Sequence, residues 1–255
     1  MLQNERQNRI LDELEIHHAV KVNELAKQLD TSESTIRRDI NELSQMGKLK
    51  KVFGGAISVS RGSAFVESDV ASRARMNVEE KERIARYAAS LIEDNDFVYL
   101  DAGTTTGRMI DFLEKKNVTY VTNGITHARR LIERGLPVFM IGGLLRPASE
   151  AVVGEAAIEA IRRFNFTKCF MGAKGLDAEK GFTTLDISEA AVKTAVMEKA
   201  GCTYMLADHT KFNLVSSVSF AALEDACIIT DRLEDPRYRT LTEILEAPEH
   251  RDDIF

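Results

Sequence analysis

A run of glycine and hydroxyl residues near the middle of the chain has the composition of a phosphate-binding loop. Asp101-Ala-Gly-Thr-Thr-Thr-Gly follows a short apolar segment and opens a helical pattern. Gly103 lets the backbone approach a ligand, amides at a helix start favour an anion, and threonine hydroxyls add donors. Aspartate and threonine also cap helices, so a purely structural role stays open. The run matches neither the P-loop ending GKS/T nor the dinucleotide fingerprint GxGxxG.

Charged and amide residues recur directly after several other apolar runs of the chain. Basic side chains can pair with a phosphate, and carboxylates can accept hydrogen bonds from sugar hydroxyls. Asp177 is one such acceptor. Each charge alone could be a solvated surface charge, but their common position after strands favours one shared site. The residues that we predict to bind this effector are Asp101, Gly103, Thr104, Thr105, Thr106, Asn123, Gly124, Arg146, Lys174, Asp208 and Lys211.

A second polar group, near the amino terminus, has the residue types that contact DNA. Ser34, Thr35, Arg37 and Arg38 occupy the exposed start of a short helical pattern. Arginine can pair with guanine through two hydrogen bonds, and serine or threonine can bond phosphate or base. A plain surface helix can carry similar charges, so the next segment matters. Lys48, Lys50 and Lys51 lie around two predicted strands joined by Gly54-Gly55, an arrangement typical of a wing that contacts phosphates.

The first 58 residues predict three helices packed through one apolar face. We expect helices over Asn4 to Glu15 and Asn23 to Leu29, with Asn23 as the N-cap of the second. Ser32 is expected to cap a third helix, whose inner residues are Ile36, Ile40 and Leu43 and whose end is marked by Gly47. Two short helices joined by a tight turn define a helix-turn-helix, in which the second helix enters the major groove.

The remaining residues alternate between short apolar runs and amphipathic helices. Residues 59–76 show no clear apolar period and are interpreted as a linker, and residues 77–255 as the larger domain. Asn77 and Glu80 fit a capping box at its first helix. Such alternation predicts an α/β domain with a mostly parallel sheet and ligands at the carboxyl ends of strands. The runs are Phe97 to Leu100, Val118 to Thr122, Val138 to Ile141, Cys169 to Gly172, Tyr204 to Ala207 and Cys227 to Thr230.

The composition is that of a globular protein rather than a membrane or disulfide-rich one. Of 255 residues, 44% are hydrophobic and 29% charged, and no apolar run approaches the ~20 residues that cross a bilayer. The net charge is −6, but basic residues gather locally between Arg37 and Arg61. Three distant cysteines suggest neither disulfides nor zinc. We expect a cytoplasmic protein, and we assign no catalytic residue, no metal and no cofactor.

Both halves resemble the DeoR family of bacterial transcriptional regulators. The amino-terminal likeness is carried by Ser34-Thr-Ile-Arg-Arg-Asp-Ile-Asn-Glu-Leu and by Gly47-Lys-Leu-Lys-Lys-Val-Phe-Gly-Gly-Ala, which depart from the family at Phe53, where a histidine is usual. The carboxy-terminal likeness is carried by Asp101-Ala-Gly-Thr-Thr-Thr, Val121-Thr-Asn-Gly, Gly142-Gly with Arg146, Phe170-Met-Gly, Glu189 with Lys193, and Leu206-Ala-Asp-His-Thr-Lys-Phe. Many members have an aspartate at the position of Thr167, and if that aspartate contacts the ligand in those members, we expect a different effector preference here.

The resemblance implies a winged helix-turn-helix followed by a domain similar to ribose-5-phosphate isomerase that binds a phosphorylated sugar. We therefore expect a repressor of a carbohydrate-utilisation operon, with double-stranded operator DNA, a sugar phosphate and further copies of itself, as a dimer or tetramer, as partners. An isomerase-like enzyme with an appended DNA-binding domain is the alternative. His127 and His209 are available to such an enzyme, although no compact acid-base pair is visible in the sequence. A purely architectural DNA-binding protein would leave the larger domain without a role.

Overall fold

The structure is a computed structural model that describes residues 3–17, 19–46, 48–58, 70–114 and 117–249. Its internal contacts divide the chain into two compact units, Met1–Val66 and Glu67–Phe255. In the part of the chain that the structure describes, no helix has the length and apolar character needed to span a membrane.

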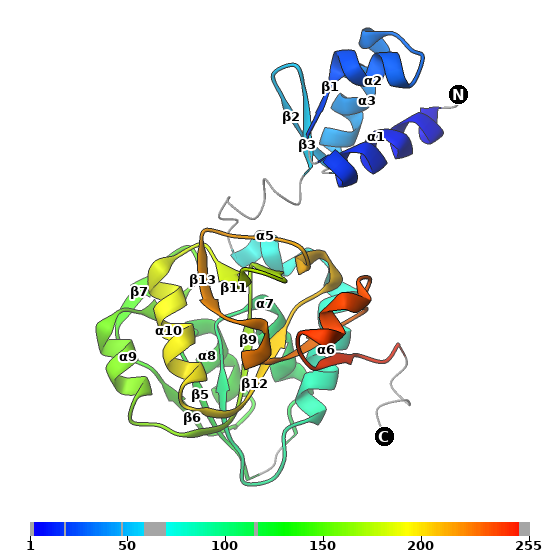
Figure 1. Ribbon diagram of the computed structural model, residues 1–255. Helices are drawn as coiled ribbons and strands as arrows, with labels where there is room; N and C mark the ends of the chain where they lie inside the picture. Colours follow the sequence, from blue (N-terminus) through cyan, green and yellow to red (C-terminus); the bar gives the residue numbers. More distant parts are fainter. Residues whose placement is uncertain (1–2, 18, 47, 59–69, 115–116, 250–255) are drawn as a thin grey trace. The chain divides into compact units, whose positions relative to one another are not determined.

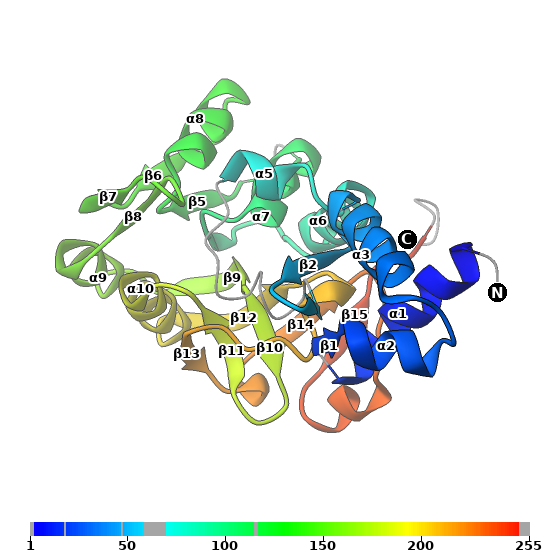
Figure 2. The same ribbon diagram turned by 90° about the horizontal axis from the view of Figure 1, so that it is seen from above.

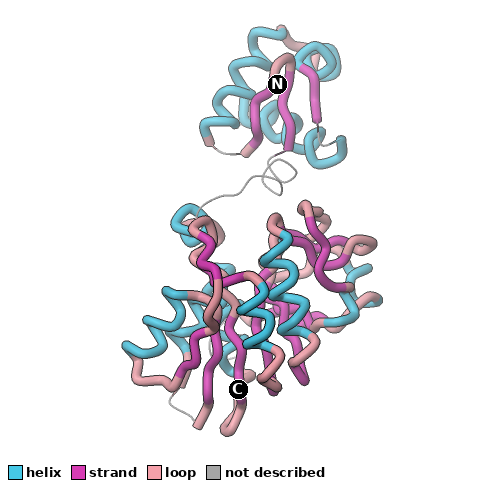
Figure 3. Tube along the Cα trace, turned by 90° about the vertical axis from the view of Figure 1, so that its left-hand side faces the viewer, coloured by secondary structure: helices cyan, strands magenta, loops and turns pink. Residues whose placement is uncertain are grey.

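The first unit consists of helices packed against a small antiparallel sheet. Strand β3 lies between β1 and β2, so β2 and β3 form the predicted hairpin and β1 joins it as an unpredicted third strand. Figure 3 shows these strands side by side against the helices. The elements are α1 (Gln3–His17), β1 (Ala19–Lys21), α2 (Val22–Gln28), α3 (Glu33–Gln45), β2 (Leu49–Val52) and β3 (Gly55–Ser58).

Helix α3 forms as predicted. The Ser32 hydroxyl accepts a hydrogen bond from the Thr35 amide (3.2 Å), which satisfies one of the free donors at the helix start. Ile36, Ile40 and Leu43 are buried in the apolar core of this unit. Gly47, the predicted end of the helix, lies outside the described residues. One helix face is therefore buried in the core, and the opposite face is exposed.

The predicted N-cap of the second helix is wrong. Helix α2 begins at Val22, its N-cap is Lys21, and no side chain caps it. Strand β1 runs directly into the helix, because its pairing with β3 holds Lys21 extended and the Val22 amide bonds the Gly54 carbonyl (2.9 Å). Asn23 thus lies inside the first turn. A strand of three residues is too short to be recognised from hydrophobic alternation.

The second unit is built on a seven-stranded parallel sheet with the order β15-β14-β12-β9-β4-β5-β6. All six predicted apolar runs are strands of this sheet, with small shifts of their ends, and β15 is a strand that the apolar pattern does not indicate. A parallel sheet is normally buried on both faces. In chain order its strands are β4 (Phe97–Leu100), β5 (Thr119–Thr122), β6 (Val138–Met140), β9 (Phe166–Gly172), β12 (Ala200–Leu206), β14 (Cys227–Thr230) and β15 (Ile244–Glu246).

Helices cover both faces of this sheet (Figures 1 and 2). Since alternate strand residues point to opposite faces, Val98 packs with Ile84 in one apolar cluster and Tyr99 packs with Val192 in the other. Helices α6 (Val78–Ser90), α7 (Thr104–Met109) and α8 (Ile125–Glu133) lie on one face, and α9 (Glu155–Ile161) and α10 (Ile187–Met197) on the other.

Smaller elements that the sequence pattern did not indicate complete the second unit. Strands β10 (Gly175–Asp177), β11 (Gly181–Thr184) and β13 (Val218–Ala221) form an antiparallel sheet, and β7 (Leu144–Arg146) pairs with β8 (Ala151–Val153). A short helix, α5 (Val70–Ala74), lies within the predicted linker.

Candidate functional site

The loops predicted to bind an effector follow neighbouring strands at one edge of the parallel sheet. Leu100 at the end of β4 pairs with Thr122 of β5 on one side and with Phe170 of β9 on the other, while Leu206 of β12 pairs with Gly172. Because these strands are parallel and in register, their carboxyl ends meet at the same edge. The loops that begin at Asp101, Asn123 and Asp208 therefore share one region.

A buried ion pair lies at the centre of this edge. The Lys193 ammonium on α10 donates to the Asp101 carboxylate (2.5 Å) and to the Gly172 carbonyl (2.8 Å). Asp101 also accepts from the Gly172 amide (3.3 Å), and both side chains are almost fully buried. Lys193 is not among the residues predicted from the sequence to bind the effector. Its signal was a lysine on the inner face of an otherwise apolar helix, next to Val192 and Val196.

The glycine-threonine run forms a tight loop at the start of α7. The Thr106 hydroxyl is fully buried, lies 2.6 Å from the Asp101 carbonyl and accepts from the Gly103 amide (3.0 Å). His127 of α8 lies against this loop, with Nε2 3.0 Å from the Gly103 carbonyl. Burial lowers the pKa of His127 to about 4, so its ring is neutral at pH 7 and Nε2–H donates to that carbonyl. Thr106 and His127 thus set the shape of the loop, whereas Thr104 is half-buried at its start.

Asn123 and Gly124 hold the adjacent loop against the first. The Asn123 amide oxygen accepts from the Ala102 amide (3.1 Å), and its nitrogen donates to the Val152 carbonyl (3.2 Å). A side chain at Gly124 would collide with His127, since a Cβ there would lie 2.8 Å from the ring nitrogen Nδ1. These residues connect β4, β5 and β8 into one rigid edge.

Basic side chains gather around Lys81, beside the loop after β12. Lys81 is nearly buried on α6, and its ammonium donates to the Arg73 carbonyl (2.5 Å). Burial lowers its pKa to about 8, Asp208 opposes that shift, and the positive charges of Lys211, Arg108 and Arg73 add to it. We call Arg73, Lys81, Arg108 and Lys211 the basic cluster. Lys81 is not among the predicted residues, although a lysine on the same inner helix face as Ile84 and Ala88 is an unusual feature of the sequence.

The predicted capping box at the start of α6 is wrong. Asn77 precedes the helix in a left-handed conformation (φ 48°) and makes no capping hydrogen bond. Its amide nitrogen instead donates to the Asp208 carboxylate (3.0 Å) and to the Thr210 hydroxyl (3.2 Å). Arg108 reaches the same segment by donating to the Ala74 carbonyl (3.1 Å). Ala74, near the end of the predicted linker, is therefore bonded to the helix after β4, and Asn77, the first residue after the linker, is bonded to the loop after β12.

Three further candidates have other contacts. Arg146 on β7 forms ion pairs with Asp186 (3.2 Å) and Glu189 (3.1 Å) at the start of α10. The Lys174 amide donates to the Thr183 carbonyl (2.9 Å), and its side chain is half-buried. The Asp177 carboxylate accepts from the Glu179 and Lys180 amides, which is the role of a turn residue.

Thr167 lies at the opposite edge of the sheet from these loops. It is near the amino end of β9, where its hydroxyl donates to the Asp96 carboxylate (2.6 Å) and accepts from the Phe97 amide (3.0 Å). The length of β9 separates Thr167 from the loops predicted to bind the effector, and the effect of this departure on effector preference stays a prediction.

In the first unit, Ser34, Arg37 and Arg38 are exposed on α3, and Thr35 is half-buried. Arg37 pairs with Glu33 (3.2 Å), an exposed contact that DNA can replace at little cost. The helix is anchored from behind, since buried Asp39 binds the Arg6 guanidinium through two hydrogen bonds (2.5 and 3.2 Å).

The wing presents basic residues around a glycine turn. Lys48, Lys50 and Lys51 are exposed, and Lys51 donates to the Asn41 side chain of α3 (2.7 Å). Gly54 has a positive φ of 80°, and a Cβ on Gly55 would lie 2.0 Å from the Val20 carbonyl oxygen. Both glycines are therefore required by the turn and by the packing of β1. Phe53, at the turn, is completely exposed.

A histidine-aspartate pair joins the loop after β12, which holds His209, to the end of β14, which Asp231 follows. Asp231 is buried and accepts hydrogen bonds from the His209 backbone amide and ring nitrogen Nδ1, both at 2.8 Å. The sequence did not indicate this pair, because its members are 22 residues apart. Among the described residues, no group of three His, Cys, Asp or Glu side chains is arranged to hold a metal ion.

Comparison with known proteins identifies both units. The family described as "DeoR-like helix-turn-helix domain" matches residues 6–62, and "DeoR C terminal sensor domain" matches residues 76–232. The chain is 42% identical to the uncharacterized HTH-type transcriptional regulator FruR of Bacillus subtilis, over 92% of this chain and 93% of that protein. It is 34% identical to the HTH-type transcriptional regulator IolR of the same organism (87% and 88%) and 31% identical to the HTH-type transcriptional repressor GlcR (93% and 92%).

Solved structures show more distant likeness. Ribose 5-phosphate isomerase A from Methanocaldococcus jannaschii matches 53% of this chain and 55% of its own, at 16% identity and a TM-score of 0.40. The translation initiation factor eIF-2B of Pyrococcus horikoshii matches 56% and 50%, at 19% identity and a TM-score of 0.41.

Proposed function

Because this chain belongs to the DeoR family of transcriptional regulators, we propose that it represses a carbohydrate-utilisation operon and leaves its operator when a phosphorylated sugar binds the second unit. The observation that carries the proposal is the basic cluster beside the strand-end loops. Four cationic side chains with Asp208 among them form a site with excess positive charge, which favours an anion.

In this proposal the phosphate binds Lys81, Lys211 and the loop of Asp101 to Thr106, and the sugar hydroxyls bond to Asp208. Four further residues complete or support the site, namely Asn123, Gly124, Arg146 and Lys174. Asn123 and Gly124 do so by holding the neighbouring loop in place. Burial lowers the pKa of the Lys81 ammonium because it disfavours the charged form. The negative charge of a bound phosphate would favour the charged form and so offset this effect.

The signal would reach DNA through the segment that precedes α6. Asn77 bonds Asp208, and α5 is held by Lys81 and Arg108, so a ligand that engages Lys81 and Asp208 competes with these contacts. A ligand shifts a conformational equilibrium only by its different affinity for the two states, commonly ~1–3 kcal/mol. We assign residues 1–58 to operator binding, 59–76 to the connection, and 77–255 to effector binding and oligomerisation in the cytoplasm.

Thermal unfolding with a panel of sugar phosphates tests the proposal, because a ligand that binds only the folded state raises its unfolding temperature. We expect one or a few sugar phosphates, but not the parent sugars, to stabilise the wild type and to release operator DNA. Lys81→Met should abolish the stabilisation, whereas Lys180→Met, at an exposed turn, should keep it. A Lys81→Met variant that responds like the wild type would overturn the assigned site.

The pKa of Lys81 adds a pH test. Since the charged ammonium binds the phosphate and its pKa is about 8, affinity should fall as pH rises from about 7 to about 9. Binding near pH 8 should also take up protons, because the bound anion raises the pKa. Calorimetry in two buffers of different ionisation enthalpy measures this uptake. Affinity that is constant over this range contradicts a role for Lys81.

The His209–Asp231 pair is the one observation that favours the alternative, an isomerase-like enzyme, because a carboxylate-oriented imidazole can act as a general base. The regulators among the relatives weigh against it. Incubation with ribose 5-phosphate and other sugar phosphates, followed by nuclear magnetic resonance of the products, distinguishes the two. Turnover that His209→Gln abolishes would establish the enzyme.

A further inference from the structure

Strand β6 forms one edge of the parallel sheet, and part of its backbone points away from the sheet. The Pro137 carbonyl accepts from the Tyr120 amide (3.0 Å), and the Ile141 amide donates to the Thr122 carbonyl (2.9 Å). Backbone groups of successive strand residues point to alternate sides. The amides and carbonyls of Val138 and Met140, which lie between these bonds, therefore face outward, and no described residue bonds to them.

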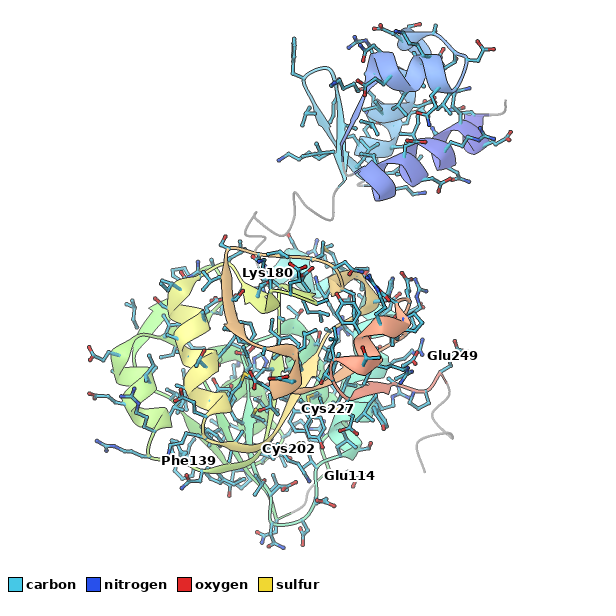
Figure 4. The ribbon with its side chains drawn as sticks, in the orientation of Figure 1. Glu114, Phe139, Lys180, Cys202, Cys227 and Glu249 are labelled. Atoms are coloured by element: carbon cyan, nitrogen blue, oxygen red, sulfur yellow. The ribbon has the colours of Figure 1, made fainter. Side chains whose placement is uncertain are left out.

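Exposed apolar side chains surround this open edge. Phe139 is 56% exposed and Met140 45%, and Leu144 on the following hairpin is 70% exposed. The Phe139 ring lies 6.1 Å from the Phe164 ring, so it stands on the sheet's margin rather than in the core. Figure 4 shows Phe139 at the rim of this unit, far from Lys180. An open, apolar strand edge is a surface that proteins normally cover or charge.

The opposite edge is protected in that way. Strand β15 carries Glu246, which forms an ion pair with Arg239, and the same guanidinium donates to the outward Ile244 carbonyl (3.5 Å). A charge and a side-chain donor thus occupy the edge where a further strand would pair. Strand β6 has no such device among the described residues.

We propose that β6 pairs antiparallel with β6 of a second copy of this chain, across a two-fold axis at Phe139. The outward groups of Val138 and Met140 are placed symmetrically about Phe139, so a two-fold rotation sets Val138 opposite Met140 of the second copy, with bonds in both directions. Phe139 then faces its own counterpart as a non-hydrogen-bonded pair, with Cα atoms about 4.5 Å apart. Aromatic residues are favoured at such a position.

We assign this edge to a second copy because the two-fold pairing places the exposed apolar side chains of each copy, Phe139 above all, against their own counterparts. The inference rests on the proposed function only in that operators are usually read by symmetric pairs. Its tests need neither DNA nor sugar phosphate, so its failure is distinguishable from a failure of the repressor proposal.

Sedimentation equilibrium of the full chain is the first test. We expect the wild type to be at least a dimer. Phe139→Lys and Met140→Pro should each halve the mass of the assembly. If the wild type is a dimer, each variant should have the chain mass of 28.5 kDa. Proline at position 140 removes only an outward amide, so the sheet itself keeps its bonds. Ile187→Lys, at a site 74% exposed on α10, should keep the wild-type mass. Circular dichroism checks that each variant is folded.

A cross-link provides a second test that does not weaken the strand. Non-hydrogen-bonded Cα atoms at about 4.5 Å lie within the range of a disulfide, so Phe139→Cys should form a covalent dimer on mild oxidation. Lys180→Cys, and the wild type with its own three cysteines, should not. A monomeric wild type, a Phe139→Lys variant of unchanged mass, or a Phe139→Cys dimer that stays unlinked on oxidation would each overturn the proposal.

Discussion

Asp101 and Lys193 form an ion pair whose two charges are removed from solvent. Attraction between buried charges offsets the loss of hydration only when the remaining hydrogen-bonding positions are filled, and here Gly172 fills one on each partner. The pair therefore fixes where β4 and β9 end relative to α10. A neutral replacement of one partner leaves the other charge buried.

We expect Asp101→Ala to lower the free energy of unfolding by about 3–5 kcal/mol, because the Lys193 ammonium loses its counter-charge in the interior. Urea denaturation measures the loss. Asp111→Ala is the matched control, since Asp111 pairs with Arg130 on the surface and its loss should cost no more than about 1 kcal/mol. Equal losses in the two variants would contradict the importance of burial.

His127 predicts a pH dependence of stability. The pKa of His127 is about 4 in the folded state and 6.5 in the unfolded state, so the unfolded state takes up a proton first as pH falls. The free energy of unfolding is therefore highest above pH 6.5 and decreases as pH falls from there through 4. The full effect is about 3 kcal/mol. His127→Gln should remove this part of the pH profile in urea unfolding at a series of pH values. An unchanged profile in the variant would mean that other groups cause it.

Helix α3 and the wing are separate elements with different expected roles in binding DNA. The helix presents its charged face because Ile36, Ile40 and Leu43 are committed to the core. The wing presents lysines because Gly54 and Gly55 permit its turn. We therefore expect residues of the helix to read bases and those of the wing to contact phosphates.

Arg37→Ala should therefore weaken operator binding by about 1–3 kcal/mol and relax preference at one base pair. Lys50→Ala should weaken binding to all sequences alike and reduce the salt slope by about one. Arg9→Ala, an exposed arginine on α1, is the control for charge alone. Fluorescence anisotropy with operator and scrambled DNA at several salt concentrations separates the cases. Equal effects of Arg37→Ala on both DNAs would argue against base readout.

For the whole molecule, Asn77 tests how the second unit communicates with the connection to the first. Asn77→Gly keeps the left-handed backbone but removes the bond to Asp208. We expect sugar phosphate still to bind, because the basic cluster is intact, while its effect on operator affinity falls from about 5–150-fold toward none. Asn95→Gly, another left-handed asparagine, is the control. Normal release by Asn77→Gly would place the coupling elsewhere.

Much of this architecture could be read from local pattern. Apolar spacing over a few residues was sufficient to predict helix α3 with its Ser32 cap and six strands of the larger unit. The residue types around Gly54-Gly55 were sufficient to predict the hairpin. The parallel alternation also placed the loops that we predict to bind the effector after strands, which must share an edge of the sheet.

Contacts between distant segments could not be read in this way. Lys193 meets Asp101 across 92 residues, Asn77 meets Asp208 across 131, and Asp231 meets His209 across 22. Spacing along the sequence has no relation to such distances, because the order of strands in the sheet determines them. The same order makes β6 an edge and leaves Phe139 exposed. The sequence alone thus determined the elements and the family, whereas the tertiary structure decided which charged groups meet and which surface remains open.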